Sequence, residues 1–313
     1  MVVWRRYETA DQPVWDKFVQ NGRARLFFYE RAFLEYHADR FVDHSLLCWE
    51  DDRLIAVLPA SQAGDTLTSH GGLTYGGLVL APRTRGAETL AAVNNLCAYA
   101  RDAGFQRIVY KAVPYIFDTL PSQDDLYAIW RNGGRIIRRD LSSVIHLDAP
   151  RKLSKGRKWL IARAKKEGLT VAESDDWQGF HDLLSSVLAR HDVTPVHTVA
   201  ELIYLKGIFP YRIKLYSVDR GGAMLAACLV FSFDTVEHTQ YIATSEEGKQ
   251  LGALDFLLEE IIGKASEEKK KHFSFGISTE NSGQYLNEGL ISQKEGFGGR
   301  GVVLDWYEID TNG

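Results

Sequence analysis

The sequence predicts an α+β protein of mixed α and β content, built from two similar domains in tandem. Short apolar runs bounded by polar turns predict strands in both halves of the chain. In each half a glycine-bearing turn, a helix and a further strand follow those strands. A length of 313 residues is enough for two domains of ordinary size.

The expected elements occur in the same order in the two halves. In the first half they are strands at 44–49, 54–58 and 66–69, a glycine-rich stretch at 71–77, a helix ending at Gly104, and a strand at 107–110. In the second half they are strands at 213–218, 223–233 and 235–243, a turn at 247–253, a helix from Leu254, and a strand at 272–276. Element order recurs while residue identity does not, so two unrelated α+β halves remain an alternative. We expect domains at 1–149 and 150–313, each a mixed central sheet flanked by helices, with a cleft between them.

The turn that precedes the second-half helix is a candidate phosphate site. A helix N-terminus presents unpaired N–H groups and a partial positive charge, which suit an anion. Gly248 and Gly252 allow close approach to the backbone, Lys249 adds charge, and Ala253 opens the helix. A plain tight turn is the alternative interpretation.

A strongly basic segment opens the second half. Residues 151–169 contain eight Lys or Arg and one acid, a net charge of +7, and predict a helix over 154–168. Lys155 and Arg157 belong to this helix. One interpretation is that this helix lines a groove for the phosphates of a nucleotide-linked substrate, coenzyme A or RNA. The other is a solvated helix whose lysine stems cover the core.

Composition narrows the class of protein. A net charge of −4 argues against a DNA-coating protein, and no DNA partner is expected. Three widely spaced cysteines predict a reducing compartment, and we expect a cytoplasmic protein. No zinc motif and no stretch of ~20 apolar residues is present, so neither a metal nor insertion into a membrane is expected.

The repeated order of elements resembles the GNAT acyltransferase fold, and the chain is more closely similar to the FemABX-like tandem-GNAT aminoacyltransferases and acetyltransferase-like proteins. The turn ending at Ala253 departs from the GNAT pattern, because Leu251 stands where a glycine belongs. The segments that carry the closer resemblance are Asp52–Pro59, Tyr75-Gly76-Gly77, the basic segment Ser154–Gly168, Phe273–Gly276, Leu286–Leu290 and Lys294–Gly299.

The resemblance implies acyl transfer to an amine and assigns roles in that reaction to several residues. The lysine of the closing motif, Lys294, matches the family's transfer site, where a cation stabilises the developing oxyanion. Arg190 matches by position an arginine that contacts a substrate diphosphate, with His191 beside it. Tyr75 of the Tyr-Gly-Gly motif is a further substrate-binding candidate.

The candidate residues for acid–base catalysis lie on the strand expected at 235–243. Alternation places Glu237 on the face of Tyr241 and opposite His238. Glu237 is the candidate general base and Tyr241 a candidate proton or hydrogen-bond donor. A solvent-facing acid and a packing tyrosine are the alternatives, and the amine could also lose its proton to water.

The leading hypothesis is transfer of an acyl group from acyl-CoA, such as acetyl-CoA, to an amine. The acceptor would be a small-molecule or nucleotide-linked amine of a phosphate-bearing cell-envelope or surface-polysaccharide precursor. One alternative is a charged tRNA as donor and a peptidoglycan precursor as acceptor, as in FemABX-type enzymes. Another is a non-catalytic binding module with a degenerate GNAT fold.

Overall fold

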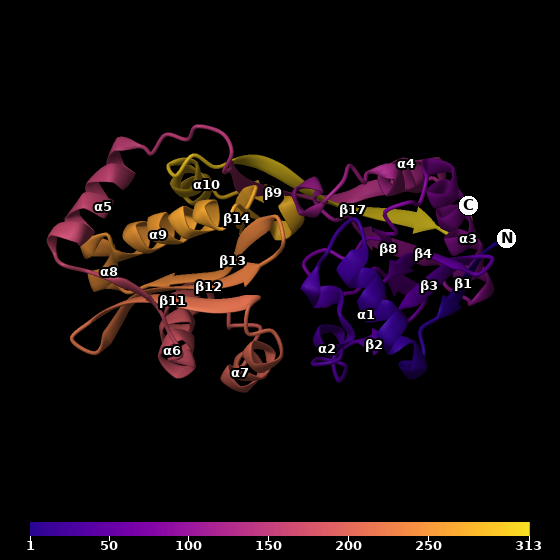
Figure 1. Cartoon of the computed structure of the whole chain (residues 1–313), viewed down its shortest axis with the longest axis horizontal. Helices are drawn as coiled ribbons and strands as arrows, with labels where there is room; N and C mark the ends of the chain where they lie inside the picture. Colours follow the sequence, from indigo (N-terminus) through magenta and orange to yellow (C-terminus); the bar gives the residue numbers. More distant parts are fainter. Residues whose placement is uncertain (313) are drawn as a thin grey trace. The chain divides into compact units, whose positions relative to one another are not determined.

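The computed structural model describes residues 1–312, and for His191 it describes the backbone only (Figure 1). Contacts within the chain separate two compact units. Unit 1 comprises Met1–Leu141, Thr279–Tyr285 and residues 303–312, and unit 2 comprises Ser142–Ser278 and Leu286–Val302. The units are therefore not the two continuous segments 1–149 and 150–313. The reason is that strands β9 (Arg135–His146) and β17 (Arg300–Asp310) each contribute residues to both units.

Unit 1 contains two groups of paired strands. The first has the order β1-β3-β4-β7, and the second has the order β8-β6-β5-β2, with Trp306–Asp310 of β17 antiparallel to β8. The strands are β1 (Val2–Arg6), β2 (Val42–Asp43), β3 (Leu46–Glu50), β4 (Arg53–Leu58), β5 (Ser61–Ala63), β6 (Thr66–Thr68), β7 (Val79–Leu80) and β8 (Arg107–Lys111). The helices are α1 (Gln12–Asn21), α2 (Arg31–Leu34), α3 (Gly86–Asp102) and α4 (Asp124–Arg131).

The core of unit 1 is built around the hairpin and the helix that the sequence predicts. β3 and β4 pair antiparallel and bury Leu46, Ile55 and Leu58. The apolar face of α3, including Ala92 and Leu96, packs in the same cluster. The N-terminal helices α1 and α2 were not anticipated from the sequence.

Unit 2 is built on the strand order β10-β11-β12-β13-β14, with Ser142–His146 of β9 antiparallel to β14. The strands are β10 (Val171–Glu173), β11 (Ile213–Arg220), β12 (Ala223–Ser232), β13 (Val236–Thr244) and β14 (His272–Ile277). The short pair β15 (Thr279–Glu280) and β16 (Tyr285–Leu286) follows. The helices are α5 (Lys155–Lys166), α6 (Trp177–Leu188), α7 (Val199–Ile208), α8 (Glu246–Leu251), α9 (Ala253–Glu267) and α10 (Glu288–Glu295).

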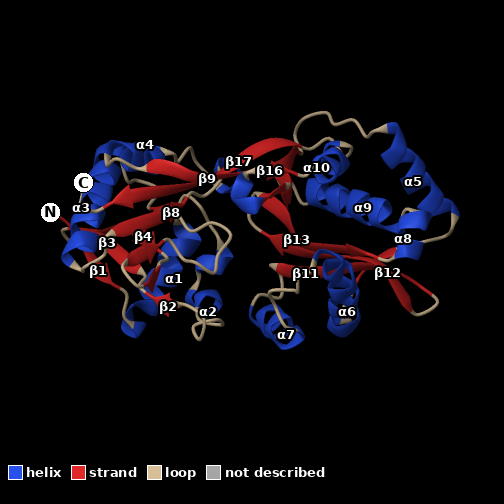
Figure 2. Cartoon of the chain, turned by 180° about the vertical axis from the view of Figure 1, so that it is seen from behind, coloured by secondary structure: helices blue, strands red, loops and turns tan. Residues whose placement is uncertain are grey.

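Helices cover both faces of this sheet, as Figures 1 and 2 show. The apolar stripe of α9 predicted from Leu254 to Ile262 is buried in the core with Cys228 and Val230 of β12. α5 packs on α9 from outside, while α6 and α7 lie on the opposite face. The predicted strands, α9 and the basic helix are confirmed to within a few residues.

The arrangement of β13 and β14 positions the candidate site. The two strands run parallel and pair only from Val236 to His238, so beyond that point they are not joined by ladder hydrogen bonds. Gln240 is a bulge, because Leu229 of β12 lies opposite Tyr241 whereas Val230 lies opposite Thr239. A gap between two strands beside a bulge is a place where a ligand can reach the sheet.

No helix in residues 1–312 combines the length and the apolar character that a bilayer-spanning segment requires.

Candidate functional site

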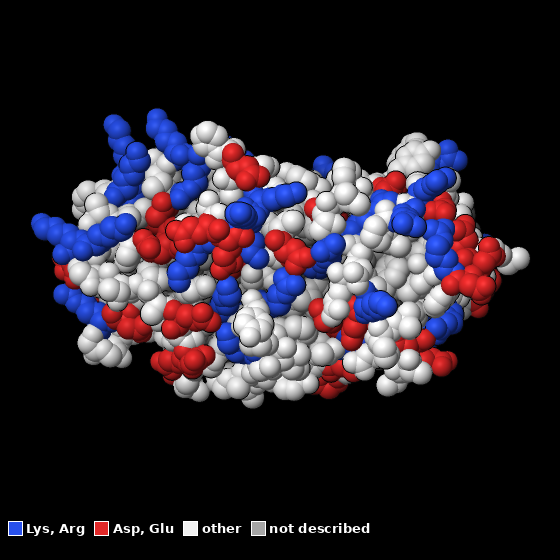
Figure 3. All heavy atoms as spheres, viewed as in Figure 1, with Lys and Arg blue, Asp and Glu red and all other residues white. Residues whose placement is uncertain are grey.

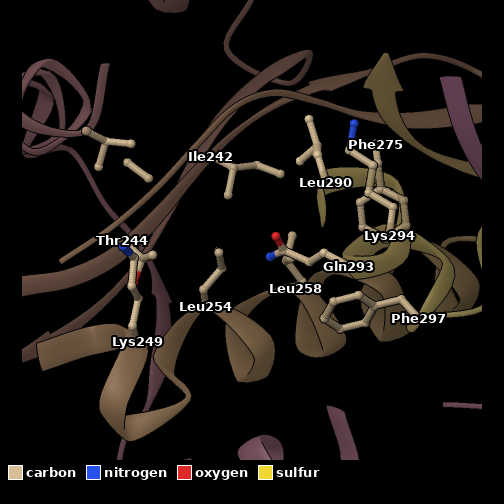
Figure 4. A pocket seen from close by; sticks show the side chains of 12 residues that line it. Ile242, Thr244, Lys249, Leu254, Leu258, Phe275, Leu290, Gln293, Lys294 and Phe297 are labelled. Atoms are coloured by element: carbon tan, nitrogen blue, oxygen red, sulfur yellow. The ribbon is translucent and has the colours of Figure 1, made fainter. Parts of the chain in front are cut away.

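A pocket of about 300 Å³ lies in unit 2 where β13 and β14 are no longer paired (Figure 4). Its wall is formed by strands β13 and β14, by helices α6, α8, α9 and α10, and by Phe297 of the closing motif. Its lining residues are Val187, Ile242, Ala243, Thr244, Lys249, Leu254, Leu258, Phe275, Leu290, Gln293, Lys294 and Phe297. Figure 4 shows Gln293 pointing into the space between Ile242 and Leu258. The walls are mainly apolar with few polar groups, as is usual for small-molecule sites.

Lys294 is the buried cation of this pocket. Its Nζ donates hydrogen bonds to the carbonyl oxygens of Gly276 at 3.0 Å and Ile277 at 2.6 Å, both at the end of β14, beyond its pairing with β13. Burial lowers the pKa of Lys294 to about 8. An ammonium group has three donors, and these two carbonyl oxygens account for two of them. Part of the Lys294 population is neutral at mildly alkaline pH.

His238 lies beside this lysine as a neutral ring. Its Nδ1 is 3.0 Å from the Ser274 hydroxyl. Burial, with Lys294 nearby, lowers the pKa of His238 to about 4, so the ring carries no charge at neutral pH. No sequence pattern singles out His238 ahead of Glu237.

The turn 247–253 is not an open loop. Ser245 caps helix α8 by accepting a hydrogen bond from the Gly248 N–H at 3.0 Å. A Cβ at Gly248 would collide with the Leu225 carbonyl of β12, and one at Gly252 would collide with the Leu160 carbonyl of α5. Gly252 also has a φ of +73°. Both glycines are therefore required by backbone packing, which is a sufficient reason for their presence without a bound phosphate.

The other predicted ligand-binding residues near that turn lie in different surroundings. Lys249 lines the pocket, and its Nζ is 2.9 Å from Glu246. Arg190, in the 3-10 turn Ala189–His191, pairs with the same carboxylate at 2.5 Å. Ala253 is fully buried. The side chain of His191 lies outside the described part of the structure, so its expected role is neither supported nor opposed.

No residue of the basic helix lines the pocket, but Arg157 bonds the first turn of α9, beside the pocket-lining Leu254. Arg157 donates a hydrogen bond to Asp255 in the first turn of α9. Burial raises the pKa of Asp255, and the neighbouring Arg157 counteracts this. Lys155 is exposed at the start of α5. The helix therefore packs through its apolar side and Arg157, while its lysines face outward.

Glu237 and Tyr241 do not share a face, contrary to the expectation from alternation. The bulge at Gln240 shifts the register, so Glu237 faces α9 while Tyr241 faces α6 and α7. Glu237 lies at the start of β13, 3.9 Å from Lys270, and burial raises its pKa. The Tyr241 hydroxyl is 2.8 Å from Nδ1 of His197. Neither residue lines the pocket.

Tyr75 belongs to unit 1. It is buried, and its ring lies 5.5 Å from that of Phe28 and 4.9 Å from that of Phe117. Its surroundings are those of an aromatic packing cluster.

Of the predicted residues, the structure brings Lys294 and Lys249 to one pocket, with Arg190 joined to Lys249 through Glu246. Sequence reasoning missed Gln293 and the apolar wall of Ile242, Phe275 and Phe297. The only available signal was adjacency, since Gln293 and Phe297 flank Lys294 in the closing motif. Among residues 1–312 no group of three or more His, Cys, Asp or Glu is placed to hold a metal ion.

Comparison with known proteins finds one matching domain model and several solved structures of similar fold. Residues 149–285 match the model of the acetyltransferase (GNAT) domain. No curated protein has a sequence that matches this chain. Among solved structures, FemX is similar over 98% of this chain and 97% of its own, with a TM-score of 0.68 and 11% identity. L-PGS from Bacillus licheniformis is similar over 99% and 94%, with a TM-score of 0.66 and 12% identity. A tandem GNAT protein from the clavulanic acid biosynthesis pathway is similar over 99% of both chains, with a TM-score of 0.54 and 10% identity.

The matched domain defines the class: residues 149–285 are a GNAT acetyltransferase domain, and the chain is by class an N-acyltransferase. Over its whole length the chain has the tandem-GNAT, FemABX-like fold that its motifs resemble.

Proposed function

We propose that unit 2 transfers an acyl group to an amine in the pocket beside Lys294. The observation that carries the proposal is the position of this buried cation at the wall of an apolar pocket, where backbone carbonyls accept two of its three N–H groups. A preorganised donor in a water-poor site stabilises the charge that develops on a carbonyl oxygen and contributes about 3 kcal/mol to lowering the barrier.

The chemistry needs few groups from the protein. The amine nitrogen attacks the acyl carbonyl carbon. The carbonyl oxygen becomes an oxyanion, which accepts a hydrogen bond from the third N–H of Lys294. The oxyanion collapses, the bond from carbon to the thioester sulfur or ester oxygen breaks, and the amide remains. The leaving thiolate or alkoxide takes up one proton while the former amine releases one to water. His238, with a pKa of about 4, is too weakly basic to drive this release.

The proposed acceptor is an amine on a phosphate-bearing precursor of the cell envelope or of a surface polysaccharide. Arg190 and Lys249 support this, because two cations converge on Glu246 next to the pocket, and a phosphate could compete for them. The three cysteines are free thiols, which fits the proposed cytoplasmic location, where such precursors and acyl-CoA are found together.

The proposed donor is acyl-CoA, supported by the match to the acetyltransferase domain. A charged tRNA is a second candidate. It is favoured by the packing of Gly248 and Gly252, which accounts for both glycines without a pyrophosphate. The fold shared with FemX is compatible with this second donor.

Two experiments test these proposals. Calorimetric titration of the full chain with acetyl-CoA, with free CoA as control, separates the donors: micromolar binding supports acyl-CoA, and no binding to a folded protein favours the charged tRNA. Transfer itself is measured by mass spectrometry of a mixture of nucleotide-linked amino sugars and muropeptides after incubation with each donor. If neither donor modifies any amine, the transfer proposal fails and a binding module becomes the better account.

A further inference from the structure

The outward face of α5 carries cations that pair with no acid in the described part of the chain. Arg157 pairs with Asp255 on the inward side, and Lys165 pairs with Glu260 at 3.5 Å. The other basic side chains of the helix and of the segment just before it make no ion pair with an acid in residues 1–312, and nearly all are exposed; they are Lys152, Lys155, Lys158, Arg163 and Lys166. Figure 3 shows basic side chains projecting from this end of unit 2. A concentrated positive surface on a chain of net charge −4 requires an explanation.

An exposed tryptophan lies within this group. Trp159 has 60% of its surface exposed, and the guanidinium carbon of Arg163 is 5.5 Å from the centre of its ring. The helix itself is well anchored, because Ile161 and Ala164 are buried in the core against α9. Trp159 is therefore held outward by the fold rather than exposed by fraying of a helix end.

We propose that this face of α5, defined by Lys155, Lys158, Trp159, Arg163 and Lys166, docks on an anionic lipid bilayer. Lysine ends on long stems reach a flat negative surface from a convex helix, and each cation near such a surface strengthens binding roughly fivefold. Indole rings favour the boundary between headgroups and acyl chains. The face is convex and has one exposed aromatic ring, whereas single-stranded nucleic acid is usually held in a groove with several stacking rings.

Such docking adds to the proposed function without depending on it. An enzyme that modifies cell-envelope precursors works on material that is assembled at a membrane. Docking through α5 would hold unit 2 at that surface, while the pocket lies on the other side of α9 from α5.

The test is co-sedimentation of the full chain with vesicles of phosphatidylglycerol and phosphatidylcholine at 1:3, with pure phosphatidylcholine vesicles alongside. No donor or acceptor is present, so the result is independent of acyl transfer. We expect binding only to the anionic vesicles, with a steep decrease as salt is raised. The double variant Lys158→Glu/Lys166→Glu should bind on the order of 100-fold more weakly, and Trp159→Ala about tenfold more weakly.

The matched control is Lys269→Glu/Lys271→Glu, which makes the same charge change on exposed residues between α9 and β14. It should bind within about twofold of the wild type. Absence of binding to anionic vesicles would overturn the proposal, as would an equal loss in both double variants. Binding of uncharged tRNA that depends on Lys158 and Lys166, without vesicle binding, would show instead that the face recognises RNA.

Discussion

The guanidinium group of Arg157 donates a hydrogen bond to the buried carboxylate of Asp255, and this bond joins the basic helix α5 to the first turn of α9. Asp255 lies three residues beyond Gly252, whose Cα is covered by the Leu160 carbonyl of the same basic helix. The N-terminus of α9 is thus closed by protein groups, with a carboxylate in its first turn where a GNAT pyrophosphate would be expected.

Loss of the ion pair between Arg157 and Asp255 should destabilise the folded protein. Arg157→Met leaves the Asp255 carboxylate buried without its cation and is expected to lower the free energy of unfolding by about 3 kcal/mol at neutral pH. Burial already raises the pKa of Asp255, and losing Arg157 raises it further. The deficit should therefore shrink as the pH falls through the folded-state pKa. Chemical denaturation at neutral and acidic pH measures both effects. Lys165→Met, which breaks an exposed pair with Glu260, should cost less than about 1 kcal/mol, and equal costs for the two variants would contradict this interpretation.

Gly252 is required by the backbone. Gly252→Ala places a Cβ against the Leu160 carbonyl at a φ of +73°, and we expect a loss of at least about 2 kcal/mol. Gly263→Ala, inside α9 with open space around the glycine, should instead be neutral or stabilise by up to about 1 kcal/mol. Urea titrations of the two variants make the comparison. A fully stable Gly252→Ala protein that had lost donor binding would show that the glycine serves a ligand.

Tyr241 is expected to be structural. Tyr241→Phe removes the hydrogen bond between its hydroxyl and His197 and should cost about 1 kcal/mol of stability. The rate of acyl transfer should change by less than about twofold, because the side chain faces α6 and α7 rather than the pocket. A large fall in kcat in a stable variant would contradict this prediction and would indicate that Tyr241 takes part in catalysis.

Glu237 should influence stability in a pH-dependent way. Its raised pKa means that ionisation of the buried carboxyl begins to oppose folding as the pH rises above the unfolded-state pKa, and does so fully above the folded-state pKa. Glu237→Gln removes that opposition, so the variant should gain stability relative to the wild type at neutral pH and lose the advantage as the pH falls through that pKa. Thermal unfolding at a series of pH values tests this. If the wild type keeps its relative stability at every pH and the variant loses transfer, Glu237 acts in catalysis instead.

Periodicity and turn chemistry were enough to predict most of the architecture. The stripe from Leu254 to Ile262 gave α9, and the apolar runs of β3, β4, β11, β12 and β13 were recognisable because polar turns bound them. The division of the chain was not predictable from one boundary, since β9 and β17 each supply residues to both units. No composition shift marks a strand that is shared in this way.

The candidate site was predictable only in part. Lys294 could be singled out through its motif, and the structure places it at a pocket. The opposite faces of Glu237 and Tyr241 could not be foreseen, because the bulge at Gln240 interrupts alternation without a glycine or proline to signal it. The stretch 247–253 was interpreted as a turn, as a phosphate site or a plain tight turn, but Ser245 caps its first part into helix α8.

The most direct test is the pH dependence of acyl transfer from a thioester to hydroxylamine, followed as hydroxamate, in the wild type and in Lys294→Met. Hydroxylamine is an unprotonated amine across the neutral and alkaline range, so it does not itself limit the rate there. The wild-type rate should decrease as the pH rises through about 8, where Lys294 loses its proton. Lys294→Met should be about 100-fold slower and lack this decrease. Equal rates for the two proteins would contradict the proposal that Lys294 stabilises the oxyanion.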